Sequence, residues 1–108
     1  MTEGVPSEER IIEQAEIIEL LRARGVDDPE VKELVIKWTA QQEVLVTAEG
    51  TAKAQITFEI NRAELYVACG DIGGALQCLE DARLQAHQEG ETELYAQIVL
   101  KMDEVEGV

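Results

Sequence analysis

The side chains best suited to covalent or acid–base chemistry are one histidine, His87, and two cysteines, Cys69 and Cys78. A thiolate nucleophile needs a base within hydrogen-bond reach and a third group that orients the base. On a continuous helix the step of nine positions from Cys78 to His87 spans about 13 Å along the axis, which is out of reach. The distance along one helix does not exclude a pair of Cys69 and His87. However, no third group that could orient the histidine is indicated for such a pair. We therefore expect no catalytic residue, and two buried free thiols.

Metal and phosphate sites are not indicated either. The two cysteines do not form a Cys-x-x-Cys motif, and the sequence has no further cysteine to complete a metal cage. Glu9, Glu13 and Glu16 share a helix face, but the Glu-x-x-His spacing of bundle metal sites is absent, so we interpret them as a solvated acidic face. Residues 70–74 lack the Lys and Ser/Thr of a phosphate-binding loop. We expect no metal and no cofactor; an acidic bundle that binds metal or a small molecule is the third-ranked alternative.

The charge balance restricts the partners. The 108 residues include 23 acidic and 9 basic side chains, for a formal net charge of -14. Nucleic acid and anionic lipid would both be repelled, so we expect neither nucleic acid nor membrane as a partner. A basic or neutral protein surface is the better match. The alternative is that the charge serves only to keep the domain soluble.

The composition is that of one small globular domain. The chain is 45% apolar and 30% charged, which fits neither a disordered polar tract nor a membrane protein. The N-terminal residues do not resemble a signal peptide, and no apolar run approaches the roughly 20 residues of a spanning helix. We predict a cytoplasmic location.

Apolar residues recur at three- and four-residue steps along most of the chain, which predicts helices. Trp38 and Leu45 belong to one such buried stripe, although residues 43–47 in isolation would suit a strand. Ser7, Thr51 and Thr92 are expected to cap helices, and Pro29 suits a first helical position. After a disordered tail at 1–6, the predicted helices are residues 8–24, 29–48, 52–69, 72–89 and 93–105. Short connections between them predict a single all-α domain over residues 1–108, with five antiparallel helices in chain order.

The most specific pattern lies in residues 63–82. Its two apolar stripes are joined at Gly70-Asp71-Ile72, and small residues stand where two helices would meet. The spacing resembles the tetratricopeptide repeat, a 34-residue helix–turn–helix with small residues at the helix contact. The match covers about residues 56–89, with residues 93–105 as a capping helix, and Ile72 and Leu79 replace aromatic residues of the pattern. The resemblance implies a helix-packing set of Ala63, Tyr66, Gly70, Ala75, Leu79 and Ala82.

The sequence departs from that family in three respects. Glu59 and Arg62 occupy positions where the repeat has a Trp or other large apolar residue and a Leu, His87 replaces the usual Pro, and no second copy is found upstream. Stacked repeats need about three copies to bury a continuous core. The single repeat must therefore be completed by the first two helices and the capping helix, or by a second subunit.

The resemblance implies a non-catalytic protein-binding scaffold. In tetratricopeptide proteins the first helix of each repeat lines a concave groove, and the matching positions here are Thr57, Ile60, Asn61, Glu64 and Val67. Only Asn61 fits the Lys, Asn and Arg set with which some members grip carboxylates. Glu64, with Glu59 nearby, instead favours a basic or amphipathic protein segment. Two alternatives stay open: the first two helices cover these positions, or the protein is a self-associating structural homodimer without a groove.

Overall fold

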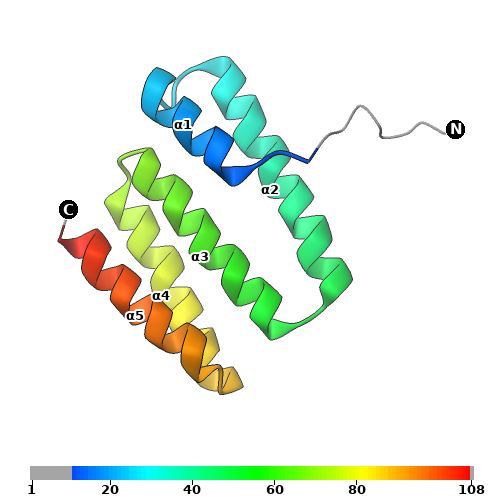
Figure 1. The fold of residues 1–108 in the computed structure, drawn as a ribbon, viewed down its shortest axis with the longest axis vertical. Coiled ribbons are helices and arrows are strands. Elements are labelled where there is room, and N and C mark those ends of the chain that lie inside the picture. Colours follow the sequence, from blue (N-terminus) through cyan, green and yellow to red (C-terminus); the bar gives the residue numbers. More distant parts are fainter. Residues whose placement is uncertain (1–10, 108) are drawn as a thin grey trace, which may run out of the picture.

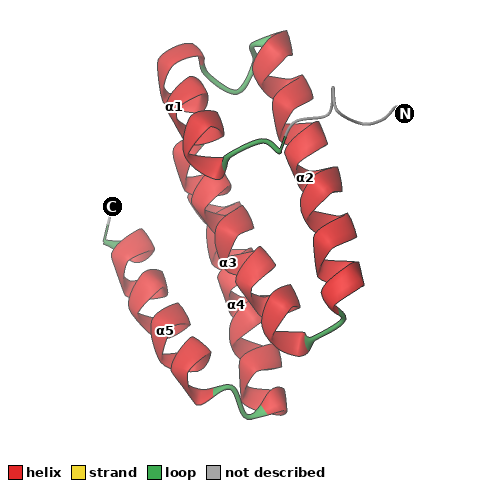
Figure 2. Ribbon diagram, turned by 45° about the vertical axis from the view of Figure 1, so that its right-hand side comes forward, coloured by secondary structure: helices red, strands yellow, loops and turns green. Residues whose placement is uncertain are grey.

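The computed structural model describes residues 11–107, and these residues form five α-helices and no strand (Figures 1 and 2). The predicted all-α class, with five helices packed in antiparallel succession, is confirmed. Residues 43–47 are helical, as predicted. None of the helices in this part of the chain is long and apolar enough to cross a membrane. The helices are α1 (Gln14–Arg24), α2 (Pro29–Glu49), α3 (Ala52–Ala68), α4 (Ile72–Glu89) and α5 (Thr92–Glu106).

Local capping chemistry explains most of these bounds. Asp28 accepts hydrogen bonds from the N–H groups of Glu30 and Val31 at the start of α2, and Thr51 accepts one from Ala54 at the start of α3. One expected cap is wrong. Thr92 is the first residue of α5 rather than its cap, and Glu91, which stands at the cap position, makes no side-chain capping bond.

The first helix begins later than predicted. Ser7 and the predicted start at Glu8 lie outside the described residues, as does the tail at 1–6, but residues 11–13 are described and are not helical. The N–H of Ile12 donates to Oε1 of Gln41 on α2, 3.0 Å away, and the Ile12 side chain is buried. A contact across 29 residues of sequence therefore overrides the local helical periodicity, which could not have foreseen it.

Two apolar cores lie on different faces of α3. Ile56 and Ala63 of α3 enter one core, and Phe58 and Leu65 enter the other. The first, here the hairpin core, joins α3 to α4 and α5 through residues that include Ala75, Leu79, Ala82, Leu94 and Ile98. The second, the N-terminal core, joins α3 to the N-terminal part through Ile12, Ile17, Leu21, Val31 and Trp38. α3 is the element common to both, and Figure 1 shows it between α2 and α4.

α3 and α4 are the most closely packed pair among the described helices. Ala63, Ala75 and Ala82 are each no more than 1% exposed, so small side chains lie where these two backbones approach. The chain reverses at Gly70, whose φ of +83° is a left-handed conformation that favours glycine. The N–H of Asp71 donates to the Tyr66 carbonyl at 2.8 Å and closes the end of α3.

Gly74 is the second position of this turn that requires a small residue. A Cβ atom there would lie 2.9 Å from Cδ1 of Tyr66 and 2.7 Å from Oδ2 of Asp71, closer than real Cβ contacts. Asp71 caps α4 by accepting a hydrogen bond from the N–H of Gly74 at 2.8 Å. The residues of the helix-packing set thus surround one turn and one helix contact: Ala63, Ala75, Leu79 and Ala82 are buried, Tyr66 is partly buried, and Gly70 is exposed in the turn.

Glu59 and Arg62 pair with each other on α3, with a guanidinium nitrogen 3.2 Å from a carboxylate oxygen. The Arg62 guanidinium also lies over the ring of Phe58, 5.7 Å from the ring centroid. Both side chains are about one third exposed or less. Arg62 therefore covers Phe58 of the N-terminal core and Glu59 neutralises Arg62, at positions where the repeat pattern has apolar side chains.

Candidate functional site

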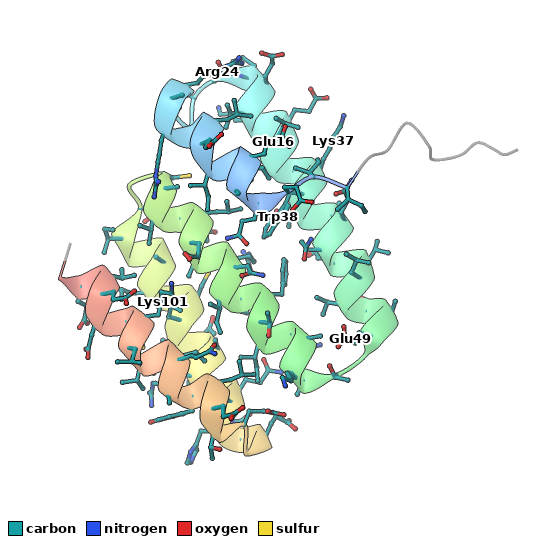
Figure 3. The ribbon with its side chains drawn as sticks, in the orientation of Figure 1. Glu16, Arg24, Lys37, Trp38, Glu49 and Lys101 are labelled. Atoms are coloured by element: carbon teal, nitrogen blue, oxygen red, sulfur yellow. The ribbon has the colours of Figure 1, made fainter. Side chains whose placement is uncertain are left out.

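The second half of α2 is poorly packed. Val31 and Trp38, in its first half, are each 1% exposed, and Figure 3 shows Trp38 between α2 and α3. No residue of α2 beyond Trp38 is buried. Val46 is only partly buried, and Leu45, predicted on the buried stripe, is 49% exposed, so that assignment is wrong. The second half of α2 therefore leaves apolar side chains available to a partner.

A hollow of about 340 Å³ lies between this half of α2 and the first half of α3. We call it the α2/α3 hollow. Val46 and Phe58 line it and also line a second hollow, of about 450 Å³, toward Gln85 of α4. The remaining side chains of the α2/α3 hollow are a mixture of apolar, amide and charged groups that includes Gln42, Leu45, Glu49, Lys53, Thr57 and Asn61.

The five predicted groove residues do not line one continuous groove. Thr57 and Asn61 line the α2/α3 hollow, whereas Glu64 and Val67 line a separate cleft of about 160 Å³ among α1, α3 and α5. Ile60 is partly buried against the hairpin core.

The start of α1 lies over the middle of the predicted groove, because Nε2 of Gln14 donates to the carbonyl oxygen of Asn61 at 3.1 Å. Ile18 and Arg22, further along the same helix, line the cleft beside Glu64. α1 thus covers part of the face of α3 that the repeat pattern assigned to a groove, and it supplies one wall of the part that stays open.

Glu64 already has a cationic partner within the chain. Nζ of Lys101 on α5 lies 3.2 Å from Oε1 of Glu64 and 4.0 Å from a carboxylate oxygen of Glu104 (Figure 3 labels Lys101). Lys101 is 37 residues from Glu64 in sequence, so spacing alone could not reveal the pair. The charge at Glu64 is consequently compensated, and it is a weaker attractant for a basic segment than the sequence suggested.

Two exposed acidic groups lie near the hollows at the second half of α2. Glu43 and Glu49 are exposed, and they line the 450 Å³ hollow and the α2/α3 hollow respectively (Figure 3 labels Glu49). Lys53 is a basic side chain beside Glu49 in the lining of the α2/α3 hollow. The sequence feature that could have predicted exposed apolar side chains here is the run of Val44, Leu45 and Val46. Three consecutive residues point in different directions around a helix, so one helix face cannot bury them all.

The groups able to do chemistry are dispersed. His87 is exposed on α4, with its ring 6.1 Å from the ring of Tyr95, whereas Cys78 is buried on the same helix. Within residues 11–107, no three His, Cys, Asp or Glu side chains are grouped so that they could hold a metal ion.

No protein-family model, curated protein or solved structure matches this chain. The tetratricopeptide resemblance therefore depends on the pattern in residues 63–82.

Both thiols are expected to react slowly with iodoacetamide, Cys78 more slowly than Cys69. Burial raises the pKa of each thiol above its usual range, so the reactive thiolate is scarcer at a given pH and alkylation should accelerate only as the pH rises toward the raised pKa. Cys69 is partly exposed and Cys78 is buried. Mass spectrometry of the native protein should show one modification before the second. The variant Cys69→Ser should show only the slow alkylation of Cys78. Rapid labelling of both cysteines in the wild-type protein would contradict the burial of Cys78 on α4.

Proposed function

We propose that this protein is a cytoplasmic, non-catalytic interaction module of tetratricopeptide-like type, which holds an amphipathic and basic protein segment in the α2/α3 hollow. The observation that carries the proposal is Leu45, a large apolar side chain that is half exposed and lines an opening between two helices. What distinguishes Leu45 from the other exposed apolar side chains is its place in this opening beside Val46 and Phe58, because an apolar opening with a polar rim is a typical docking site.

The size and lining of the hollow suit side chains from one face of a helix. Its volume of about 340 Å³ is at the low end for ligand sites, so it accommodates a few apolar side chains rather than a whole ligand. Leu45, Val46 and Phe58 supply apolar contact, while Asn61 and Thr57 contribute polar groups to the lining of the hollow. This is the arrangement in which an amphipathic helix is held in a groove.

The charge of the chain selects a basic partner. The net charge is -14, and Glu49 lines the hollow while Glu43 lines the hollow on the other side of Val46. Lysine or arginine on the polar face of the bound helix would meet these carboxylates. Opposite charge raises the rate of encounter and disfavours acidic competitors, more than it adds affinity.

A defined probe tests the proposal. A fluorescently labelled helical peptide of leucines and lysines should bind the wild-type protein, and its counterpart of leucines and glutamates should bind weakly, as measured by fluorescence anisotropy. Leu45→Glu should weaken binding of the lysine peptide at least tenfold, because the substitution places a charge in the apolar contact. Leu84→Glu, on α4, is the matched control: Leu84 is 47% exposed and lies outside the hollow.

Circular dichroism should show the same helicity for both variants, since both residues are about half exposed. If Leu45→Glu binds the lysine peptide as tightly as wild type, the hollow is not the site. If Leu84→Glu weakens binding as much as Leu45→Glu does, the loss is not specific to the hollow and the hollow is not the site. If the two peptides bind equally well, the preference for a basic partner is wrong.

A further inference from the structure

A pocket of about 240 Å³ lies between α2 and α3, at the end of the molecule that holds the α1–α2 connection and the end of α3 (Figure 1). We call it the Cys69 pocket. Its lining includes Val26, Val35, Arg62, Leu65, Tyr66 and Cys69. None of the residues that line it also lines the α2/α3 hollow, so the two are separate sites.

Most of the wall of the Cys69 pocket belongs to the N-terminal core. Leu65 is one of the buried residues of that core, and Val35 and Cys69 pack against it. Thr39 also lines the pocket, but its hydroxyl donates to the carbonyl oxygen of Val35 at 2.9 Å. The donor of this polar side chain is therefore already used, and the wall offers a ligand mainly apolar contact.

The size of the Cys69 pocket corresponds to one ring. An apolar cavity of about 150 Å³ in a protein core is enough to bind benzene. At about 240 Å³ the pocket accommodates a six-membered ring with a small substituent. Sites for larger ligands usually begin at about 300 Å³, so a nucleotide or a large cofactor is not the expected occupant.

Two side chains of α3 favour an aromatic ring over a saturated one. The guanidinium of Arg62 is attracted to the negative face of an aromatic ring, as its position over Phe58 already shows. The ring of Tyr66 prefers an edge-to-face or offset contact with a second aromatic ring. A saturated ring of the same size would fill the same volume without either attraction.

The charges at the Cys69 pocket favour a neutral ligand. Arg62 is paired with Glu59 at 3.2 Å, so it is not a free cation for an anionic ligand, and the net charge of -14 repels anions in general. A cationic ligand would lose its hydration against apolar side chains, and no carboxylate is among the residues that line the pocket.

We propose that the Cys69 pocket binds a small, uncharged aromatic molecule with a single ring. Such a ligand would extend the N-terminal core, because it would contact α2 and α3 at the same time. This site is independent of the proposed peptide site, and it assigns the protein a second ligand of a different chemical class.

Phenol is a suitable probe, followed by two-dimensional amide NMR of the full chain. Phenol should shift the amide signals of the residues that line the Cys69 pocket and leave those of Gln42 and Thr57, in the α2/α3 hollow, unchanged. We expect a dissociation constant in the millimolar range, because so small a ligand makes few contacts. Cyclohexanol, with the same hydroxyl and ring size, should bind at least fivefold more weakly. Benzoate should bind at least tenfold more weakly, because its charge would be desolvated.

A pair of valine variants tests the location of the site. Val26→Asp should weaken phenol binding at least tenfold, because it places a charge at the pocket. Val99→Asp on α5 is the matched control and should leave binding unchanged, since both valines are exposed and Val99 is outside the pocket. Circular dichroism should show the same helicity for both variants.

Three results would overturn the proposal. The first is that phenol shifts no amide signal, or shifts those of all the described helices alike, as a non-specific solvent effect would. The second is that Val26→Asp binds phenol as well as Val99→Asp does. The third is that cyclohexanol or benzoate binds as tightly as phenol, which would contradict the expected ligand class. Binding of the lysine peptide is measured separately and at other residues, so failure of either site is distinguishable from failure of the other.

Discussion

Replacing Trp38 by alanine is expected to lower the free energy of unfolding by about 3–5 kcal/mol and to release α1 and α2 from a core that remains helical. Trp38 is 1% exposed, is among the largest fully buried side chains, and its ring centroid lies 6.0 Å from that of Phe58. Besides Trp38, only Val31 of α2 is buried. Without the indole, α2 keeps little apolar contact with α3, and α1 loses one of the two helices against which it packs.

Native-state hydrogen exchange measures this prediction most directly. In Trp38→Ala, backbone amides of α1 and α2 should lose protection, while those of α3, α4 and α5 keep most of theirs, because the hairpin core contains no residue of α1 or α2. Urea unfolding followed by circular dichroism gives the loss of stability. Leu45→Ala, on the same helix but half exposed, should change the free energy of unfolding by less than about 0.5 kcal/mol. If protection is lost equally in all five helices, the two cores unfold as one unit and the prediction is wrong.

The helices were predictable where local chemistry decides them. The bounds of α2, α3 and α4 follow from caps at Asp28, Thr51 and Asp71 and from glycines at helix ends, all of which are local signals. The start of α1 was not predictable, because the hydrogen bond between the Ile12 N–H and Gln41 joins residues far apart in sequence. Periodicity identifies an apolar face but does not say whether another element meets it.

The candidate site shows the same limit more strongly. The pattern placed Leu45 on a buried stripe, but its exposure depends on how closely α2 packs against α3. The groove positions were taken from one helix face, and no spacing rule predicts that Gln14 binds the carbonyl of Asn61 or that Lys101 pairs with Glu64. Site geometry here is set by contacts between helices, and these contacts are non-local.

Replacing Leu79 by alanine is expected to cost about 2–5 kcal/mol and, unlike Trp38→Ala, to destabilise all five helices together. Leu79 is fully buried in the hairpin core. A cavity there weakens the packing of α4 on α3, and α3 also supplies Phe58 and Leu65 to the N-terminal core. α1 and α2 therefore cannot keep their packing surface once α3 is lost.

Leu79→Ala retains Trp38, so the fluorescence of this single indole reports on the N-terminal core while circular dichroism reports on all helices. The two urea transitions should coincide and shift together to lower denaturant concentration. Leu84→Ala on the same helix, where Leu84 is 47% exposed, should leave the midpoint nearly unchanged. A Trp38 transition that stays at the wild-type midpoint while helicity falls earlier would show that α1, α2 and α3 fold without the hairpin core. Because α3 belongs to both cores, we expect damage at Leu79 to spread to α1 and α2, whereas damage at Trp38 stays confined to them.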